Sequence, residues 1–180
     1  MLGSGTRRWL NVINTGTLYT PWREEFVLGP RDQECIFCEP EKRRHVRELI
    51  LYRGKRAFVV LNRYPYNTGH LMVVPYRHVA QLEELKPAES NELMALITLS
   101  SRVMNERLQP AGMNVGMNLG QAGGAGIEGH LHVHLVPRWV GDTNFMPVAF
   151  KTRVLSVGLH TVRKRLKAGF DAAKAKERKR

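Results

Sequence analysis

The chain has 180 residues, of which 43% are hydrophobic, and this length and composition suit one globular domain with a sizeable core. No stretch approaches the ~20 apolar residues of a membrane span, and residues 1–14 hold no apolar run of signal-peptide length, so we expect a cytoplasmic protein without a membrane segment. The formal net charge of +12 predicts attraction to polyanions, such as nucleotides, nucleic acids or acidic surfaces, without choosing among them.

The cysteines stand in one short motif. Residues 1–17 are interpreted as a loose arm, and residues 18–26 form an aromatic cluster that we interpret as a packing segment. Cys35 and Cys38 follow in a CxxC arrangement. A structural disulfide is rare in the cytoplasm. The pair is therefore a redox motif, two free thiols, or half of a zinc site that needs two further ligands, which histidines could supply.

The middle of the chain alternates between strand and turn signals. Runs rich in β-branched and aromatic residues predict strands at 49–53, 57–62 and 70–75. Proline, asparagine and glycine at 64–69 predict the connecting turn between the second and third of these strands.

Two amphipathic helices are expected, with a short helix at 79–85 before them. The first spans 87–108, and its apolar residues recur at steps of three or four, which predicts a buried stripe: Leu93, Leu96, Ile97, Val103, Met104 and Leu108. The second lies after Phe150 and carries the apolar residues Val154, Val157, Val162, Leu166 and Phe170. We divide the chain into an N-terminal arm at 1–17, a domain at 18–150 and a basic C-terminal helix or tail at 151–180. The basic side chains of this tail are interpreted as a solvated surface, with nucleic-acid binding as the alternative.

A glycine-rich segment joins two further predicted strands. Residues 114–120 alternate between apolar side chains and small or polar ones, so that one face of the strand would leave room for a ligand. The alternative is a weak edge strand with glycines at bulges. The loop at 121–129 could present successive backbone N–H groups to an anion.

Three histidines follow this loop at every second position. His130, His132 and His134 alternate with apolar residues, so on a strand the three imidazoles share one face while the apolar side chains enter the core. Imidazole serves as nucleophile, acid, base or metal ligand. Spacing along a strand favours an extended anionic ligand over a single metal bound by all three rings. The alternatives are a half-buried strand that happens to carry histidines and a metal-binding tract.

The segment from His130 to Val136 resembles the signature of the histidine-triad (HIT) superfamily. Residues 137–139 and 141–145 are similar to its diadenosine polyphosphate hydrolase and phosphorylase branch, and the resemblance covers about residues 18–147. It implies an α+β fold, with an antiparallel sheet of about five strands and with the long helix and a C-terminal helix packed on it. It also implies a homodimer formed through the long helix and neighbouring strands.

The resemblance implies roles for particular residues. His132 would attack phosphorus as the nucleophile, and His134 would bind the α-phosphate or leaving-group oxygen as a general-acid partner. The further candidates for nucleotide contacts are Asn62, His70, Asn118, Gly124 and Gly126. Gly126 stands where phosphorylase-like members carry Ser, which puts inorganic phosphate as the acceptor in doubt.

The resemblance also implies a structural Cys₂His₂ zinc site. Its ligands would be Cys35, Cys38, His78 and His130, with His45 as the competitor for the third place. His130 is a candidate for both the triad chemistry and the metal, and zinc binding would exclude it from proton transfer. Mg²⁺ could accompany the substrate.

The resulting expectation is a nucleotide hydrolase or phosphorylase that acts on phosphoanhydride or phosphoramidate bonds. Its expected substrates are dinucleoside polyphosphates, such as diadenosine tetraphosphate, or related adenylates. The reaction would pass through a covalent nucleotidyl-histidine. The alternatives are an enzyme that processes nucleic-acid adenylates and a non-catalytic nucleotide-binding module.

Overall fold

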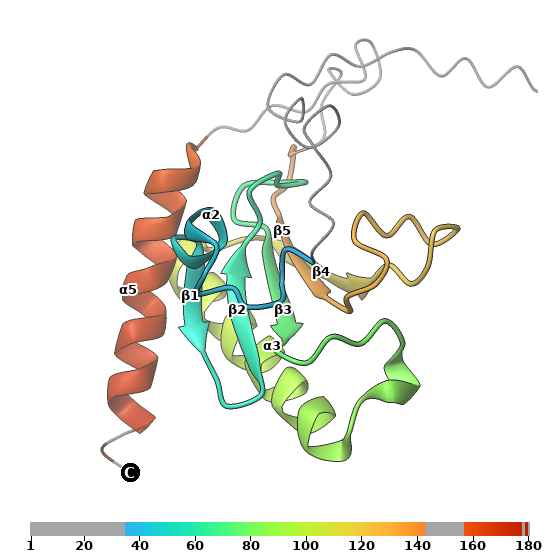
Figure 1. Cartoon of the computed structure of the whole chain (residues 1–180). Coiled ribbons are helices and arrows are strands. Elements are labelled where there is room, and N and C mark those ends of the chain that lie inside the picture. Colours follow the sequence, from blue (N-terminus) through green and yellow to red (C-terminus); the bar gives the residue numbers. More distant parts are fainter. Residues whose placement is uncertain (1–34, 143–156, 178, 180) are drawn as a thin grey trace, which may run out of the picture.

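The computed structural model of the chain describes residues 35–142, 157–177 and 179 (Figure 1). Its elements are α2 (Arg44–Arg47), β1 (Ile50–Arg53), β2 (Ala57–Leu61), β3 (Leu71–Pro75), the 3₁₀ helix η2 (Leu82–Glu84), α3 (Pro87–Leu108), β4 (Gly112–Met117), β5 (Val133–Arg138) and α5 (Leu159–Glu177). The predicted N-terminal arm, the aromatic segment at 18–26 and Val154 lie outside the described residues.

The five strands form one antiparallel sheet in the order β1-β2-β3-β5-β4. This arrangement confirms the predicted α+β class and places the strand of the triad between β3 and β4. His134 pairs with Met72 on one side and with Gly116 on the other. Directly opposed residues of an antiparallel pair point to the same face, so the space beside Gly116 is next to the His134 side chain.

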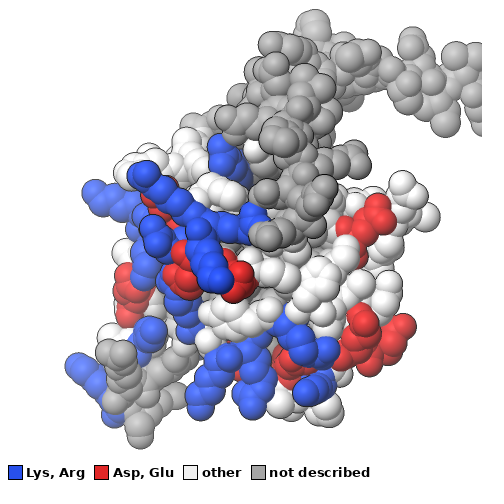
Figure 2. All heavy atoms as spheres, in the orientation of Figure 1, with Lys and Arg blue, Asp and Glu red and all other residues white. Residues whose placement is uncertain are grey.

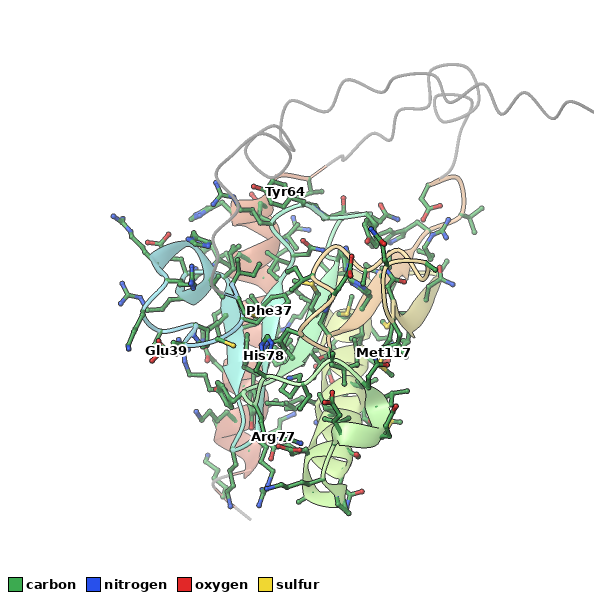
Figure 3. The ribbon with its side chains drawn as sticks, turned by 45° about the vertical axis from the view of Figure 1, so that its right-hand side comes forward. Phe37, Glu39, Tyr64, Arg77, His78 and Met117 are labelled. Carbon is green, nitrogen blue, oxygen red and sulfur yellow. The ribbon has the colours of Figure 1, made fainter. Side chains whose placement is uncertain are left out.

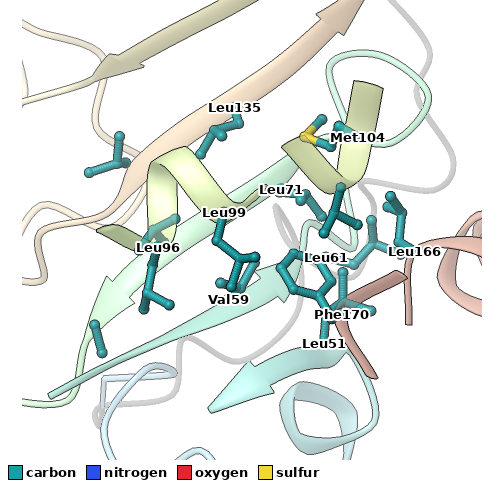
Figure 4. Close-up of a cluster of buried hydrophobic side chains, with 14 of the residues drawn as sticks. Leu51, Val59, Leu61, Leu71, Leu96, Leu99, Met104, Leu135, Leu166 and Phe170 are labelled. Carbon is teal, nitrogen blue, oxygen red and sulfur yellow. The ribbon is translucent and has the colours of Figure 1, made fainter. Parts of the chain in front are cut away.

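Helices α3 and α5 cover one face of the sheet, and the main hydrophobic core lies between them and the strands (Figures 1 and 4). Its labelled members in Figure 4 are Leu51, Val59, Leu61, Leu71, Leu96, Leu99, Met104, Leu135, Leu166 and Phe170. Strands β2 and β3 are buried throughout, because a second apolar cluster covers their other face. This buried position explains their nearly continuous apolar sequences.

The second cluster forms around Phe37, between the two cysteines. Phe37 is 2% exposed and packs edge-on against Phe58 of β2. The other buried members of this cluster are Val46, Ile50, Val60, Met72 and Val74. The CxxC segment is thereby attached to the same face of the sheet as His134.

The predicted helix at 87–108 is confirmed over its whole length. Strands β1, β2 and β3 are each one residue shorter than predicted, and three other segments differ more. The short helix expected at 79–85 is a single 3₁₀ turn at Leu82–Glu84. The strand expected at 114–120 is β4, Gly112–Met117, and the triad strand starts at Val133 rather than at His130. The connecting loop leaves the sheet at both ends, and the backbone N–H of Leu131 donates to the carbonyl of Val79 instead of to a neighbouring strand.

None of the helices in the described part of the chain combines the length and hydropathy needed to cross a lipid bilayer.

Candidate active site

The three histidines lie on one side of their segment, as the alternation predicted. Leu131, Val133 and Leu135 enter the main core. The rings of His132 and His134 are in an edge-to-face arrangement with centroids 4.8 Å apart. The ring of Phe37 contacts the first two histidines, with its centroid 5.6 Å from that of His130 and 5.4 Å from that of His132.

The region beside His134 has room for a ligand. Gly116, its partner on β4, has no atom within 4 Å of the position that a Cβ would occupy. The rings themselves are nearly enclosed, with His132 5% and His134 8% exposed. The rings of His132 and His134 are thus close together and buried beside an open position at Gly116, and their catalytic role stays a prediction.

The proton position on His132 follows from its partner. Its Nδ1 lies 2.8 Å from the backbone carbonyl oxygen of His130. A carbonyl can only accept, so Nδ1 carries the hydrogen and Nε2 carries the lone pair. Burial lowers the pKa of His132, and the bond to the His130 carbonyl opposes this shift. A neutral imidazole with a lone pair on Nε2 has the form that a nucleophile needs.

His134 is bound to His70, a residue that precedes it by 64 positions. Nε2 of His70 lies 2.9 Å from Nδ1 of His134. His70 is fully buried, and burial, followed by the charges of His134 and His132, lowers its pKa to about 3. Burial and the charge of His132 lower the pKa of His134 to about 4. Both rings are therefore neutral at neutral pH.

Asn62 and His70, which were predicted as nucleotide contacts, form a hydrogen bond with each other, and His70 in turn contacts His134. Asn62 Oδ1 accepts the backbone N–H of Tyr64 at 2.9 Å, and its Nδ2 lies 3.2 Å from His70 Nδ1. The backbone N–H of Tyr66 donates to the same nitrogen at 3.0 Å. Direct contact of either residue with a nucleotide stays a prediction.

Two aromatic residues at the site were not predicted from the sequence. The ring of Tyr66 lies 4.6 Å from that of His70 and 5.5 Å from that of His134. The sequence pattern around Tyr66 predicts only a turn, although an aromatic residue shortly before a Gly-His pair is an available signal. Phe37, between the two cysteines, could have been recognised by its position between the candidate metal ligands.

The glycine-rich loop forms hydrogen bonds within itself. The backbone N–H of Gly124 donates to the carbonyl of Gln121 at 2.9 Å. Asn118 Nδ2 donates to the Gly124 carbonyl at 3.4 Å. Gly126 is exposed in the same loop. Gly124 thus uses its amide in a local turn, and the anion contacts expected of Asn118, Gly124 and Gly126 stay predictions.

A second group of side chains could hold a metal ion. The ligand atoms of Cys35, Cys38, His78 and His130 all lie within 4.8 Å of one another. Figure 3 shows His78 near Phe37, in front of the sheet. His45, the competing candidate, is exposed on α2 and does not belong to this group.

The protonation of His130 suits this group. Its Nε2 lies 2.9 Å from the carbonyl oxygen of Pro75, so Nε2 carries the hydrogen and the Nδ1 lone pair faces the sulfur atoms. Nδ1 of His130 lies 3.2 Å from Cys35 Sγ and 3.7 Å from Cys38 Sγ, and Nδ1 of His78 lies 3.2 Å from Cys38 Sγ. Tetrahedral zinc with ordinary Zn–S and Zn–N bonds places sulfur and nitrogen about 3.6 Å apart. The donor set and its spacing therefore fit zinc.

A family model described as the HIT domain matches residues 43–140, which is more than half of the chain. The chain belongs to the HIT domain family.

Similar proteins support this assignment. This HIT chain is 49% identical over 118 residues to an AP-4-A phosphorylase of Mycobacterium tuberculosis. The alignment covers 66% of the chain and 60% of that protein. It is 30% identical over 93 residues to a bis(5'-nucleosyl)-tetraphosphatase (asymmetrical) of Schizosaccharomyces pombe, covering 52% of the chain and 50% of that protein. The chain thus spans about 60% or less of the length of these relatives.

The fold is also that of a solved HIT protein. A crystal structure of a Zn-bound histidine triad family protein from Mycobacterium smegmatis aligns with a TM-score of 0.64. The alignment has 22% identity and covers 79% of this chain and 96% of that protein. This similarity confirms the predicted HIT fold.

Proposed function

We propose that the chain is an enzyme that cleaves a phosphoanhydride bond of dinucleoside polyphosphates, such as diadenosine tetraphosphate, through a covalent nucleotidyl-His132. The observation that carries the proposal is the hydrogen bond from His132 Nδ1 to the His130 carbonyl, which leaves the lone pair on Nε2. The relatives named as a phosphorylase and a tetraphosphatase support this substrate class.

The reaction needs two displacements at the same phosphorus. In the first, the His132 Nε2 lone pair forms an N–P bond, and the P–O bond to the leaving phosphate breaks with its electron pair on that oxygen. The His130 carbonyl holds the Nδ1 proton as positive charge develops on the ring. His134 donates a hydrogen bond to phosphoryl oxygens. In the second, an acceptor oxygen displaces His132, whose electron pair returns to Nε2.

The acceptor determines the products. Water gives a nucleoside monophosphate and releases a proton, whereas inorganic phosphate gives a nucleoside diphosphate. The relative named AP-4-A phosphorylase supports phosphate as the acceptor, whereas Gly126 in place of Ser argues against phosphate. Assays with and without phosphate separate the two, because only phosphorolysis converts diadenosine tetraphosphate to ADP and ATP. Mg²⁺ bound with the substrate stays a prediction.

Replacement of the nucleophile tests the proposal. We expect His132→Ala to lower kcat by about 10³-fold or more while nucleotide affinity changes only a few-fold, because the lost group acts on the reacting phosphorus. The matched control is His45→Ala, an exposed histidine on α2. In wild type, rapid quenching in alkali followed by peptide mass spectrometry should place the nucleotide on His132. Undiminished turnover in His132→Ala, or an adduct on another residue, contradicts the mechanism.

We also propose that Cys35, Cys38, His78 and His130 bind one structural zinc ion. The support is the donor set with its near-tetrahedral spacing and the Zn-bound protein of the same fold. Zinc held by four protein ligands has no open position, so it would stabilise the fold rather than activate water. Phe37 lies between the cysteines and touches the ring of His132, which connects this site to the nucleophile.

A further inference from the structure

We propose that the turn at 62–66, acting through His70, keeps His134 a neutral hydrogen-bond donor, so that the site favours substrates whose leaving group departs as an anion. This inference rests on the proposed function and assigns His70 as a positioning residue rather than a nucleotide contact. It depends on which nitrogen of each ring carries the hydrogen, and the backbone determines this.

Two backbone N–H groups determine the direction of the hydrogen bonds that run from Asn62 through His70 to His134. The N–H of Tyr64 can only donate, so the atom of Asn62 that receives it is Oδ1, and Nδ2 faces His70. The N–H of Tyr66 can only donate as well, and it points at His70 Nδ1 at 3.0 Å. Both neighbours of His70 Nδ1 are therefore donors, and this nitrogen must carry a lone pair.

The position of the hydrogen on His70 then determines its position on His134. A neutral His70 with a lone pair on Nδ1 carries its hydrogen on Nε2 and donates it to His134 Nδ1 at 2.9 Å. His134 consequently has its lone pair on Nδ1 and its hydrogen on Nε2. Among the described residues, His134 Nε2 is buried without a hydrogen-bond partner, so its N–H has no acceptor until a ligand supplies one.

The same contact opposes a second proton on His134. An imidazolium would carry a hydrogen on Nδ1 directed at the Nε2–H of His70, and two donors would face each other. In the part of the chain that the structure describes, the rings beside His134 are those of His70, His132 and Tyr66, and Met72 and Gly116 lie opposite it in the sheet. None of these five supplies a carboxylate, and the lowered pKa values of His70 and His134 agree with this arrangement.

A donor with a single proton limits the leaving group. The N–H of a neutral imidazole is far too weak an acid to give up its proton, so His134 binds phosphoryl oxygens without protonating the departing atom. When His132 forms the N–P bond, the electron pair of the broken bond must leave as an anion. A phosphate oxygen does so readily at neutral pH, whereas the amine of a phosphoramidate must take up a proton as it departs.

The protonation state can be measured without any turnover. Long-range ¹H–¹⁵N correlation spectra of the full chain with labelled histidines report which ring nitrogen carries hydrogen. We expect His134 to be protonated on Nε2 alone at pH 7. A signal of imidazolium, or of hydrogen on Nδ1, overturns the inference even if the enzyme is active.

The leaving-group preference is tested with adenosine 5'-phosphoramidate and with aryl esters of AMP whose phenols span a range of pKa. We expect wild-type kcat to fall by about fivefold or more per unit of phenol pKa, and phosphoramidate to react about 100-fold more slowly than the ester of the most acidic phenol. Equal rates across the series overturn the inference. Absence of turnover and of adduct with every substrate contradicts the proposed function instead, while the spectra still test His134.

Two variants of His70 separate positioning from simple packing. His70→Phe keeps a ring but removes the N–H, and we expect the ratio of phosphoramidate to aryl-ester rates to rise about tenfold as His134 becomes able to hold a second proton. His70→Gln keeps an N–H donor and should restore the wild-type ratio, and His45→Phe is the exposed control. An unchanged ratio in folded His70→Phe contradicts the role of His70. If His70→Phe does not fold, the spectra of the wild-type protein and its rates with the leaving-group series still test the inference.

Discussion

Three chemically identical side chains differ in which ring nitrogen carries the hydrogen, because their hydrogen-bond partners differ. His130 donates from Nε2 to the Pro75 carbonyl, and His132 donates from Nδ1 to the His130 carbonyl. His134 instead accepts on Nδ1 from His70. The lone pair therefore lies on Nδ1 in His130, facing the cysteines, and on Nε2 in His132. Each backbone partner thus fixes which nitrogen is free for the role we propose, metal ligand for His130 and nucleophile for His132.

At the residue scale we predict that removal of the metal ligands disturbs the nucleophile. Wild-type protein should contain one zinc ion per chain by atomic absorption. Cys35→Ser should lose it and lower the free energy of unfolding by several kcal/mol, because a structural site contributes its binding energy to folding. Activity should fall as well, since Phe37 loses its anchor beside His132. Thermal unfolding, metal content and kcat measure the three effects.

His45→Ser is the matched control, since His45 lies outside the metal group. Full zinc content in Cys35→Ser would be inconsistent with the assigned ligands. Wild-type protein purified without zinc but with full stability would also argue against a structural ion.

At the scale of elements, the side chains of Asn67 and Arg138 hold the turn before His70 against the strand that carries His134. Asn67 Nδ2 donates to the Pro137 carbonyl at 3.0 Å and to Asp142 Oδ2 at 2.7 Å, which attaches the 62–70 turn to the end of β5. Arg138 forms two hydrogen bonds with the same carboxylate, at 2.7 and 2.8 Å. The turn that orients His70 and the strand that carries His134 are therefore held together at this end.

The close packing of α5 on α3 depends on Gly169. A Cβ at this position would lie 2.6 Å from Val103 Cγ1 and 3.0 Å from Arg107 Cγ. We predict that Gly169→Leu lowers the free energy of unfolding by about 1–3 kcal/mol, because the larger side chain separates the two helices. Urea unfolding followed by circular dichroism measures the change.

Ala172→Leu provides the control on the same helix, because Ala172 is exposed. Equal stability of the two variants would show that α5 does not pack tightly at Gly169.

The edge strand β4 offers a surface for association. Val115, Met117 and Leu119 are 50%, 38% and 36% exposed, and β4 lies at one edge of the sheet. A long exposed edge with apolar side chains is a typical site for pairing with another strand. The homodimer stays a prediction, and this edge is the surface that favours it.

At the scale of the whole molecule, positive charge is concentrated on one helix. Of the charged residues in α5, six are Lys or Arg and two are acidic. Figure 2 shows blue side chains gathered on the side of α2 and α5, with acidic residues among them. Several of these cations have local partners: Arg163 donates to the Glu48 carbonyl, Lys167 pairs with Asp171, and Lys174 lies 5.7 Å from the Tyr52 ring centroid. Nucleic-acid binding through this helix stays a prediction.

We predict that the buried histidines make the fold sensitive to mild acid. His70 and His134 have folded-state pKa values of about 3 and about 4, below the ordinary histidine value. Above pH ~6.5 both histidines are neutral in the folded and in the unfolded chain, so the free energy of unfolding is at its full value. Between pH ~6.5 and ~4 the unfolded chain binds protons that the folded chain does not, so stability falls by up to about 1.4 kcal/mol per pH unit for each group.

Urea unfolding at several pH values tests this slope. His70→Gln should reduce the slope by about 1.4 kcal/mol per pH unit in that window, because one titrating group is removed. His45→Gln, at an exposed position, should leave it unchanged. A wild-type stability that is flat from pH 7 to pH 5 would rule out the neutral buried network.

The sequence by itself determined the order and type of most elements, and it predicted where the chemistry lies. Pro87–Leu108 was predicted to the residue, because apolar spacing in a long helix is a local signal. The alternation at 130–135 correctly separated ring and core faces, because strand geometry has a period of two. Boundaries beside the glycine-rich loop were less accurate, since pairing there depends on neighbouring strands.

Only the tertiary structure decided which atoms meet. His78 rather than His45 joins the cysteines, although it is 40 residues from Cys38. The partners that orient His130 and His134 are 55 and 64 residues away in the chain. Hydrogen-bond polarity is a property of atoms brought together by folding, so no local pattern can specify which ring nitrogen holds the proton.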